Sequence, residues 1–240
     1  MQWDDYDAAL FDLDGVLTPT AEVHMSAWAR MFTDFLTARG VAEPYTDADY
    51  FAHIDGRPRY EGVATMLASR GIDLPAGSPD DPGSAETVSG LGNRKNELFT
   101  QVLRSEGITP YAGSLALLDH LAGVGVAMAV VSSSKNAPEV LRAAGIADRF
   151  PVVVDGVIAH DQGLPGKPRP DTYSYAAEQL GVPTSRSVVV EDAISGVQAG
   201  AAGDFGLVVG VDRGVGADAL RENGAELVVQ DLAELIGDHS

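Results

Sequence analysis

Five short, almost continuously apolar runs recur along the 240-residue chain, and segments of helical periodicity lie between them. The runs are "AALFDL" (8–13), "VAMAVVSSS" (126–134), "PVVVDG" (151–156), "SVVVEDA" (187–193) and "GLVVGV" (206–211). Runs of this kind are typical of parallel strands that are buried on both faces. The patterns between them predict helices over 114–124, 137–144 and 171–180. This alternation predicts an α/β fold with a doubly wound parallel sheet.

The interval from 21 to 104 interrupts this alternation, because it shows helical periodicity and no convincing buried strand. Trp28, Met31, Phe32 and Phe35 fall at helical spacing, which indicates a helix that packs one apolar face on its neighbours. The stretch 73–92 is rich in Pro, Gly, Ser and Asp, so we expect a loop there. We therefore expect a core domain of residues 1–20 and 105–240, with residues 21–104 inserted as a helical domain after the first strand.

The composition excludes several classes of partner. There are 16 basic and 35 acidic residues, and the net charge of -19 disfavours binding to nucleic acid or to anionic membranes. The chain has no cysteine, so it forms neither disulfides nor thiolate metal sites. The acidic start lacks the layout of a signal peptide, and no apolar run is long enough to span a bilayer. We expect a cytoplasmic enzyme.

Polar side chains follow several of the predicted strands. Asp12 and Asp14 follow the first strand, Ser132 lies at the end of the second, and Glu191 and Asp192 end the fourth. Lys167 stands in the segment "GLPGKPRPD" between the third and fourth strands. Each residue alone is most simply explained as turn chemistry, a helix cap or a solvated side chain. Because ligands bind at the carboxyl ends of parallel strands, the set together indicates one convergent site.

The charge of this set predicts a metal ion. Close pairs among Asp12, Glu191 and Asp192 would repel each other by about 4 kcal/mol at an effective dielectric constant near 20. Without a cation, one or more of these carboxylates would bind a proton. Hard carboxylate oxygens in an open geometry suit Mg²⁺, which keeps positions for water and a phosphate oxygen. The sequence therefore predicts a Mg²⁺-dependent phosphate site.

The catalytic roles can be divided among four residues. Asp12, at the end of its strand, is placed to attack phosphorus and form an aspartyl phosphate. Asp14 lies in the turn two residues later and can serve as general acid and then general base. Lys167 adds a positive charge beside the transferring group, and Ser132 offers a hydroxyl donor to phosphate oxygens.

With these motifs assembled, the chain resembles the haloacid dehalogenase superfamily. "DLDGVLT", "VVSSS", "GKPRPD" and "VVVEDAISGVQAG" are similar to its four motifs, in order. The resemblance implies a Rossmann-like core with a helical cap inserted after the first strand, Asp12 as nucleophile and Asp14 as acid/base. It also implies that Mg²⁺ is held by Asp12, the main-chain carbonyl of Asp14, Glu191 and Asp192. The second aspartate of the first motif favours phosphoryl transfer over dehalogenation.

A narrower resemblance is to the β-phosphoglucomutase-like subgroup. It rests on "TAEVHMSAW", "DGRPRYEGV", "RKNE" and "SSSKN". The resemblance implies that His24 is a hinge histidine, that Lys95 is its partner and that Arg57 grips a distal phosphate. It adds to the substrate-binding set Ser134, Lys135 and Asn136. Pro19 departs from this subgroup, which commonly has Asp there.

Three functions follow as hypotheses. The first is a mutase that interconverts β-glucose 1-phosphate and glucose 6-phosphate. The second is a sugar-phosphate phosphatase, which Pro19 and the 73–92 loop keep open because both could alter closure of the cap. The third is a phospho-acceptor signalling module, although such modules are about half as long and carry their acceptor after the third strand. For an enzyme we expect a small phosphorylated sugar as substrate and a monomer or weak dimer.

Overall fold

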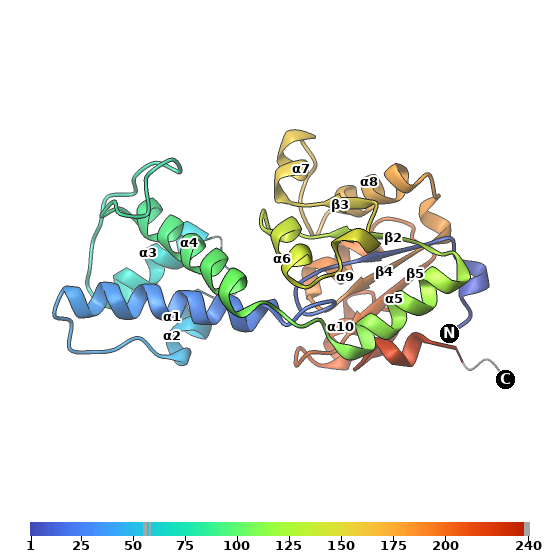
Figure 1. Ribbon diagram of the computed structural model, residues 1–240, viewed down its shortest axis with the longest axis horizontal. Helices are drawn as coiled ribbons and strands as arrows, with labels where there is room; N and C mark the ends of the chain where they lie inside the picture. Colours follow the sequence, from blue (N-terminus) through green and yellow to red (C-terminus); the bar gives the residue numbers. More distant parts are fainter. Residues whose placement is uncertain (55–56, 58, 238–240) are drawn as a thin grey trace. The chain divides into compact units, whose positions relative to one another are not determined.

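The computed structural model describes residues 1–54, 57 and 59–237. The chain divides into two compact units, which we call the core unit (Met1–Thr20 and Ile108–Ser240) and the helical unit (Ala21–Gly107). Figure 1 labels most of the helices and strands.

The core unit is built on a parallel sheet of six strands in the order β3-β2-β1-β4-β5-β6. The strands are β1 (Ala8–Phe11), β2 (Ala127–Val131), β3 (Val152–Val154), β4 (Ser187–Glu191), β5 (Leu207–Val211) and β6 (Leu227–Val229). The chain runs outward from β1 to β2 and β3, then returns to the other side of β1 as β4. The strand order thus reverses at β1, and this confirms the predicted doubly wound α/β fold.

Helices cover the sheet because its strands are apolar on both faces. Leu10, Ala129 and Val189 form one buried cluster with residues of α8 and α9. α8 contacts β1, β2 and β3, whereas α9 contacts β4 and β5. The helices of this unit are α5 (Ala112–Val124), α6 (Ala137–Ala143), α7 (Gly156–Asp161), α8 (Asp171–Leu180), α9 (Ile194–Ala201) and α10 (Ala217–Glu222). Short 3-10 turns are η1 (Trp3–Asp5), η2 (Ala147–Arg149), η3 (Thr184–Arg186) and η4 (Leu232–Leu235).

Two strands of the core unit differ from the prediction, and the helices α7, α9 and α10 were not predicted. The strand predicted over 151–156 ends at Val154, because the Asp155 carboxylate accepts the N–H groups of Val157 and Ile158 and begins α7. The edge strand β6 was not predicted at all. Its three residues are too few to show a period, and its pairing with β5 defines it as a strand.

The helical unit contains α1 (Thr20–Ala38), α2 (Asp47–His53), α3 (Arg59–Ser69) and α4 (Val88–Glu106). Its apolar core includes Trp28, Met31, Phe32 and Phe35, so the predicted packing role of this stripe is confirmed. Trp28 and Phe32 stack with their ring centroids 5.6 Å apart. Among the described helices, none combines the length and the apolar character needed to cross a lipid bilayer.

The loop predicted over 73–92 ends earlier than expected, because α4 begins at Val88. The Thr87 hydroxyl accepts the N–H of Gly90 and caps the helix, and it donates to the Asp81 carboxylate within the loop. The loop is also tied to α4 by Asn93, whose amide donates to the carbonyls of Pro79 and Asp81.

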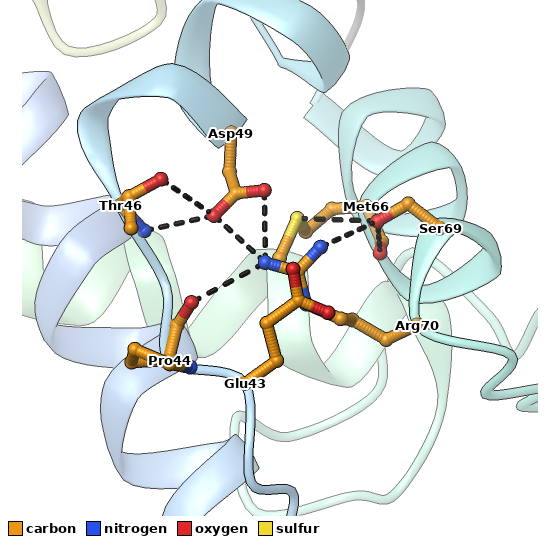
Figure 2. A network of polar contacts seen from close by, with 7 residues as sticks. All are labelled: Glu43, Pro44, Thr46, Asp49, Met66, Ser69 and Arg70. Atoms are coloured by element: carbon orange, nitrogen blue, oxygen red, sulfur yellow. Dashed lines mark hydrogen bonds and ion pairs between the residues drawn. The ribbon is translucent and has the colours of Figure 1, made fainter.

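A buried ion pair joins the start of α2 to the end of α3 (Figure 2). One guanidinium nitrogen of Arg70 lies 2.9 and 2.8 Å from the two carboxylate oxygens of Asp49. The side chains of Arg70 and Asp49 are only 7% and 10% exposed. Asp49 also accepts the N–H of Thr46 at 2.8 Å, which completes a capping box. This network fixes the segment that leads into α2.

Candidate active site

Asp12, Ser132 and Glu191 lie at the carboxyl ends of three neighbouring strands. Asp12 follows β1 directly, Ser132 follows β2, and Glu191 is the last residue of β4. The Asp12 N–H still donates to the Val190 carbonyl at 2.9 Å, so the sheet ladder holds the backbone of the proposed nucleophile. The topology therefore brings together side chains that are far apart in the sequence.

The turn after β1 places Asp14 beside this group. Gly15 has φ of +82°, a conformation that favours glycine, and its N–H donates to the Thr18 carbonyl at 2.8 Å. A Cβ atom on Gly15 would lie 1.9 Å from the Asp192 carboxylate. Glycine is thus required for two reasons, the backbone angle and the close approach of Asp192. We call residues 12–18 the catalytic turn.

Lys167 binds two of the carboxylates at once. Its Nζ lies 2.5 Å from Asp12 Oδ1 and 2.6 Å from Glu191 Oε1, and it also donates to the Val131 carbonyl at 3.1 Å. The Lys167 side chain is 8% exposed. One buried ammonium therefore orients the end of β1, the end of β2 and the end of β4.

Glu191 is held on both of its oxygens. Oε1 accepts from Lys167 and from the Tyr173 hydroxyl at 3.1 Å, and Oε2 accepts the Ala193 N–H at 3.0 Å. Gly196 makes room for this carboxylate, since a Cβ there would lie 1.7 Å from Glu191 Oε1. The sequence analysis did not identify Tyr173, because an aromatic residue on a helix is most simply a core residue.

The carboxylates of the cluster outnumber the positive charge of Lys167 beside them. Burial raises the pKa of Asp12 well above its ordinary value; Lys167 opposes the shift, and Glu191, Asp14 and Asp192 add to it. Burial, followed by Glu191 and Asp14, raises the pKa of Asp192 to about 7. Burial disfavours the charged form of Lys167, but Asp12 and Glu191 outweigh it and raise the pKa of the ammonium. Lys167 alone does not neutralise these carboxylates.

The donor set fits a magnesium ion. One oxygen each from Asp12, Glu191 and Asp192 lie within 4.8 Å of one another. Opposite oxygens in an octahedral Mg²⁺ site are about 4.2 Å apart, so a group of this size can surround one ion after a small adjustment. Burial, and then the neighbouring carboxylates, raise the pKa of Asp12 and of Asp192, so a divalent cation bound here would favour their ionised forms.

The segment after β2 forms a chain of short turns. Ser132 Oγ accepts the Ser134 N–H at 3.1 Å, and Ser134 Oγ accepts the Asn136 N–H at 3.1 Å. Ser132 and Asn136 are buried, whereas Lys135 is exposed. Because the Ser132 oxygen is an acceptor here, its own hydrogen is available for donation to a phosphate oxygen.

In the helical unit, His24 of α1 and Lys95 of α4 are direct partners. Lys95 Nζ lies 2.6 Å from His24 Nδ1, and the His24 ring stacks on Phe99 with the centroids 4.3 Å apart. Burial lowers the pKa of His24 well below its ordinary value, and the charges of Lys95 and Arg59 lower it further. A neutral His24 that accepts from Lys95 at Nδ1 carries its proton on Nε2.

The two arginines of "GRPRY" have different surroundings. Arg57, flanked by positions outside the described residues, pairs with Glu61 at 3.0 Å, and the two side chains are 41% and 56% exposed. Arg59 donates to Asn96 at 3.0 Å, and its charge acts on His24. The sequence analysis proposed Arg57 and did not consider Arg59, which stands in the same basic cluster.

Comparisons with known proteins show the family of this chain. A family described as haloacid dehalogenase-like hydrolase matches residues 6–204. The chain therefore belongs to the haloacid dehalogenase-like hydrolase family.

Its relatives place it within the β-phosphoglucomutase-like subgroup of that family. It is 48% identical to a protein of Mycobacterium bovis named β-phosphoglucomutase, over 95% of this chain and 91% of that protein. It is 31% identical to the validoxylamine A 7'-phosphate phosphatase of Streptomyces hygroscopicus subsp. limoneus, over 98% of both chains. The crystal structure of a Thermotoga maritima protein described as a β-phosphoglucomutase superposes on this chain with a TM-score of 0.74. The two sequences are 28% identical, and the superposition covers 96% of each chain.

Proposed function

We propose that the protein is a Mg²⁺-dependent phosphomutase that interconverts β-glucose 1-phosphate and glucose 6-phosphate through an aspartyl phosphate on Asp12. The single observation that carries the choice of a mutase is the 48% identity, over 95% of this chain, with a protein named β-phosphoglucomutase. The pairing of Asp12 with Lys167 at the end of β1 supports the phosphoryl chemistry.

In the first half-reaction, a sugar bisphosphate donates a phosphoryl group to Asp12. An Asp12 oxygen forms a bond to phosphorus while the bond from phosphorus to the sugar oxygen breaks. Asp14 gives its proton to that departing oxygen. In the reverse sense, a sugar hydroxyl loses its proton to Asp14 and attacks the aspartyl phosphate, which frees the Asp12 carboxylate. Exchange of the two phosphates through a bisphosphate thus completes the isomerisation.

The residues that would hold Mg²⁺ are Asp12, the main-chain carbonyl of Asp14, Glu191 and Asp192. When bound, the ion neutralises the carboxylates and the phosphate oxygens, which otherwise repel the incoming substrate. Lys167 contributes a permanent positive charge beside Asp12, and Glu191 keeps it there. The backbone and hydroxyl donors after β2 would bind phosphate oxygens, together with Ser132, Ser134, Lys135 and Asn136.

The helical unit supplies the charges that a second phosphate needs. The positive charges of Lys95 and Arg59 act on the neutral His24 within this unit, and Arg57 lies two residues from Arg59. We propose that these residues, with Arg59 in the role first given to Arg57, recognise the distal phosphate. By family resemblance, residues 21–104 act as a cap that excludes water from the aspartyl phosphate.

A phosphatase is the second candidate, because one relative that is aligned over nearly its whole length is named as a phosphatase. It would use the same residues but let water attack the phosphate on Asp12. Pro19 stands beside the catalytic turn, at a position where the β-phosphoglucomutase-like subgroup commonly has Asp, and this difference favours the phosphatase. For either reaction we propose a cytoplasmic monomer or weak dimer that acts on a small phosphorylated sugar.

One assay separates the two candidates. Purified protein is given β-glucose 1-phosphate, Mg²⁺ and a trace of glucose 1,6-bisphosphate, and glucose 6-phosphate and inorganic phosphate are measured in parallel. A mutase produces glucose 6-phosphate with little phosphate and depends on the bisphosphate. Stoichiometric release of phosphate would instead establish the phosphatase. The Asp12→Asn variant, which has no nucleophile, serves as the blank for both products.

A further inference from the structure

Arg213 contacts the catalytic turn from the far end of the chain. It lies two residues after β5, and its Nε donates to the Gly15 carbonyl at 2.8 Å. Its Nη1 donates to the Gln230 carbonyl at 3.0 Å. The guanidinium carbon lies 3.9 Å from the centroid of the Tyr111 ring. All of these contacts are within the core unit.

The hydrogen bond from Arg213 fixes the carbonyl of Gly15, the residue at which the chain turns after β1. The Gly15 N–H is bound by the Thr18 carbonyl, and the Gly15 carbonyl is bound by Arg213. Both backbone polar groups of Gly15, which has φ of +82°, are therefore satisfied, one from within the turn and the other from Arg213. Rotation of the 14–15 peptide plane would break the bond to Thr18, and rotation of the 15–16 peptide plane would break the bond to Arg213.

Arg213 is presented by a preformed loop. The Asp212 carboxylate accepts the N–H groups of Gly214 and Gly216 at 2.9 and 3.0 Å, and the Asp212 N–H donates to the Val229 carbonyl. Tyr111 is also anchored to the same turn, since its N–H donates to the Leu17 carbonyl at 3.1 Å. The guanidinium thus lies between two anchored partners, which limits the positions that its side chain can take.

We propose that Arg213 is a positioning residue, which holds the Gly15 carbonyl and thereby keeps Asp14 in the place from which it transfers a proton. Arg213 touches no reacting atom in this arrangement. The expected effect of Arg213 substitutions on turnover rests on the proposed function. Their expected effect on the structure of the turn does not. A planar guanidinium is required, because one group must donate in two directions while it stacks on an aromatic ring.

The test compares Arg213→Met and Arg213→Lys with a matched control, Arg186→Met. Arg186 is an arginine of the same unit that pairs with Asp7 at the start of the sheet, at the opposite end of β1 from Asp12. The first readout is hydrogen–deuterium exchange of the peptide that covers residues 13–18. We expect faster exchange in both Arg213 variants and the wild-type rate in Arg186→Met, because Arg213 binds this turn and Arg186 binds Asp7 instead.

The second readout is steady-state kinetics with Mg²⁺ at saturation. We expect kcat to fall about 10- to 100-fold in Arg213→Met, with KM little changed, since a small misplacement of a catalytic group slows the chemical step. Added guanidinium at millimolar concentration should restore part of kcat in Arg213→Ala, where it can occupy the space over Tyr111. A general loss of folding would not be rescued in this way.

Wild-type exchange over 13–18 in Arg213→Met, or an unchanged kcat, would overturn the proposal. Should Arg213→Met fail to fold, Arg213→Lys keeps the charge but cannot form both bonds over the ring, and the same two readouts apply to it. If wild-type protein does not isomerise β-glucose 1-phosphate, the proposed function falls, and the exchange experiment still decides the role of Arg213.

Discussion

The ammonium of Lys167 lies 2.5 Å from the carboxylate of Asp12, although 155 residues separate them in the chain. The same ammonium lies 2.6 Å from Glu191, so one cation links the ends of β1 and β4. Two carboxylates that would otherwise repel each other share this charge. This pairing favours the ionised form of Asp12 and so opposes the burial that raises its pKa.

Replacement of Lys167 by Met is expected to lower kcat by at least about a hundredfold, because the charge beside the transferring group is lost. It should also favour the protonated, non-nucleophilic form of Asp12, since Lys167 is the group that opposes the rise of the Asp12 pKa. Steady-state kinetics at saturating Mg²⁺ measure the effect. Arg169→Met is the control, because Arg169 is in the same segment with its side chain 69% exposed. Equal losses in both variants would contradict the assigned role.

The contribution of Asp192 to the stability of the metal-free protein should decrease as the pH rises from about 4 to about 7. Burial and neighbouring carboxylates raise the pKa of Asp192 from 3.8 to about 7. An acid with a raised pKa binds its proton more tightly in the folded state, so its contribution is complete below pH 3.8 and is lost as the pH rises through about 7. We expect a slope of up to about 1.4 kcal/mol per pH unit in the free energy of unfolding.

Urea denaturation at several pH values, with a chelator present, measures this slope. Asp192→Asn should flatten it, because the amide does not titrate. Saturating Mg²⁺ should also flatten it, because the ion competes with the proton for the carboxylates. The control Asp218→Asn alters a carboxylate that is 95% exposed and should leave the slope as in the wild type. A slope that is the same in the wild type and in Asp192→Asn would refute this prediction.

The contribution of His24 to the stability of the protein should depend on pH in the opposite sense to that of Asp192. Burial, and then Lys95 and Arg59, lower the pKa of His24 well below 6.5. The folded state therefore binds fewer protons than the unfolded chain, and the stability contributed by neutral His24 is complete above pH 6.5 and is lost as the pH falls through the lower folded pKa. His24→Gln keeps an acceptor for Lys95 and removes the titration. The stability difference between the wild type and His24→Gln should shrink on acidification from pH 7 by up to about 1.4 kcal/mol per pH unit. A constant difference would contradict a neutral, buried His24.

The ion pair of Arg70 and Asp49 should contribute to stability rather than to chemistry. Removing one partner of a buried pair leaves an uncompensated charge, so Arg70→Met is expected to destabilise the protein by about 3 kcal/mol. The double variant Arg70→Met/Asp49→Leu should lose less than the sum of the two single variants. Thermal and urea denaturation of all four proteins give the coupling. Strictly additive effects would show that the contact in Figure 2 carries no pairwise energy.

The comparison of expectation with structure shows which inferences local patterns support. The apolar runs identified five of the strands, because burial on both faces leaves a continuous apolar signal. The signal failed for β6, which has three residues and is defined only by its pairing with β5. It also failed at 155–156 and at 88–92, where the cap residues Asp155 and Thr87 begin helices inside segments whose composition indicated a strand end and a loop.

Local patterns in the sequence were enough to predict five strands in their order, polar residues (Asp12, Asp14, Ser132, Glu191 and Asp192) at or just after the strand ends, and an excess of negative charge among them. The contacts between distant residues became clear only from the folded chain: Lys167 with Glu191 and Tyr173, Arg59 with His24, and Arg213 with Gly15. The difference lies in the distance along the chain over which each kind of interaction acts. Periodicity and turn chemistry act between neighbours in the chain, whereas partners separated by as many as 198 residues are chosen by the packing of the sheet and its loops.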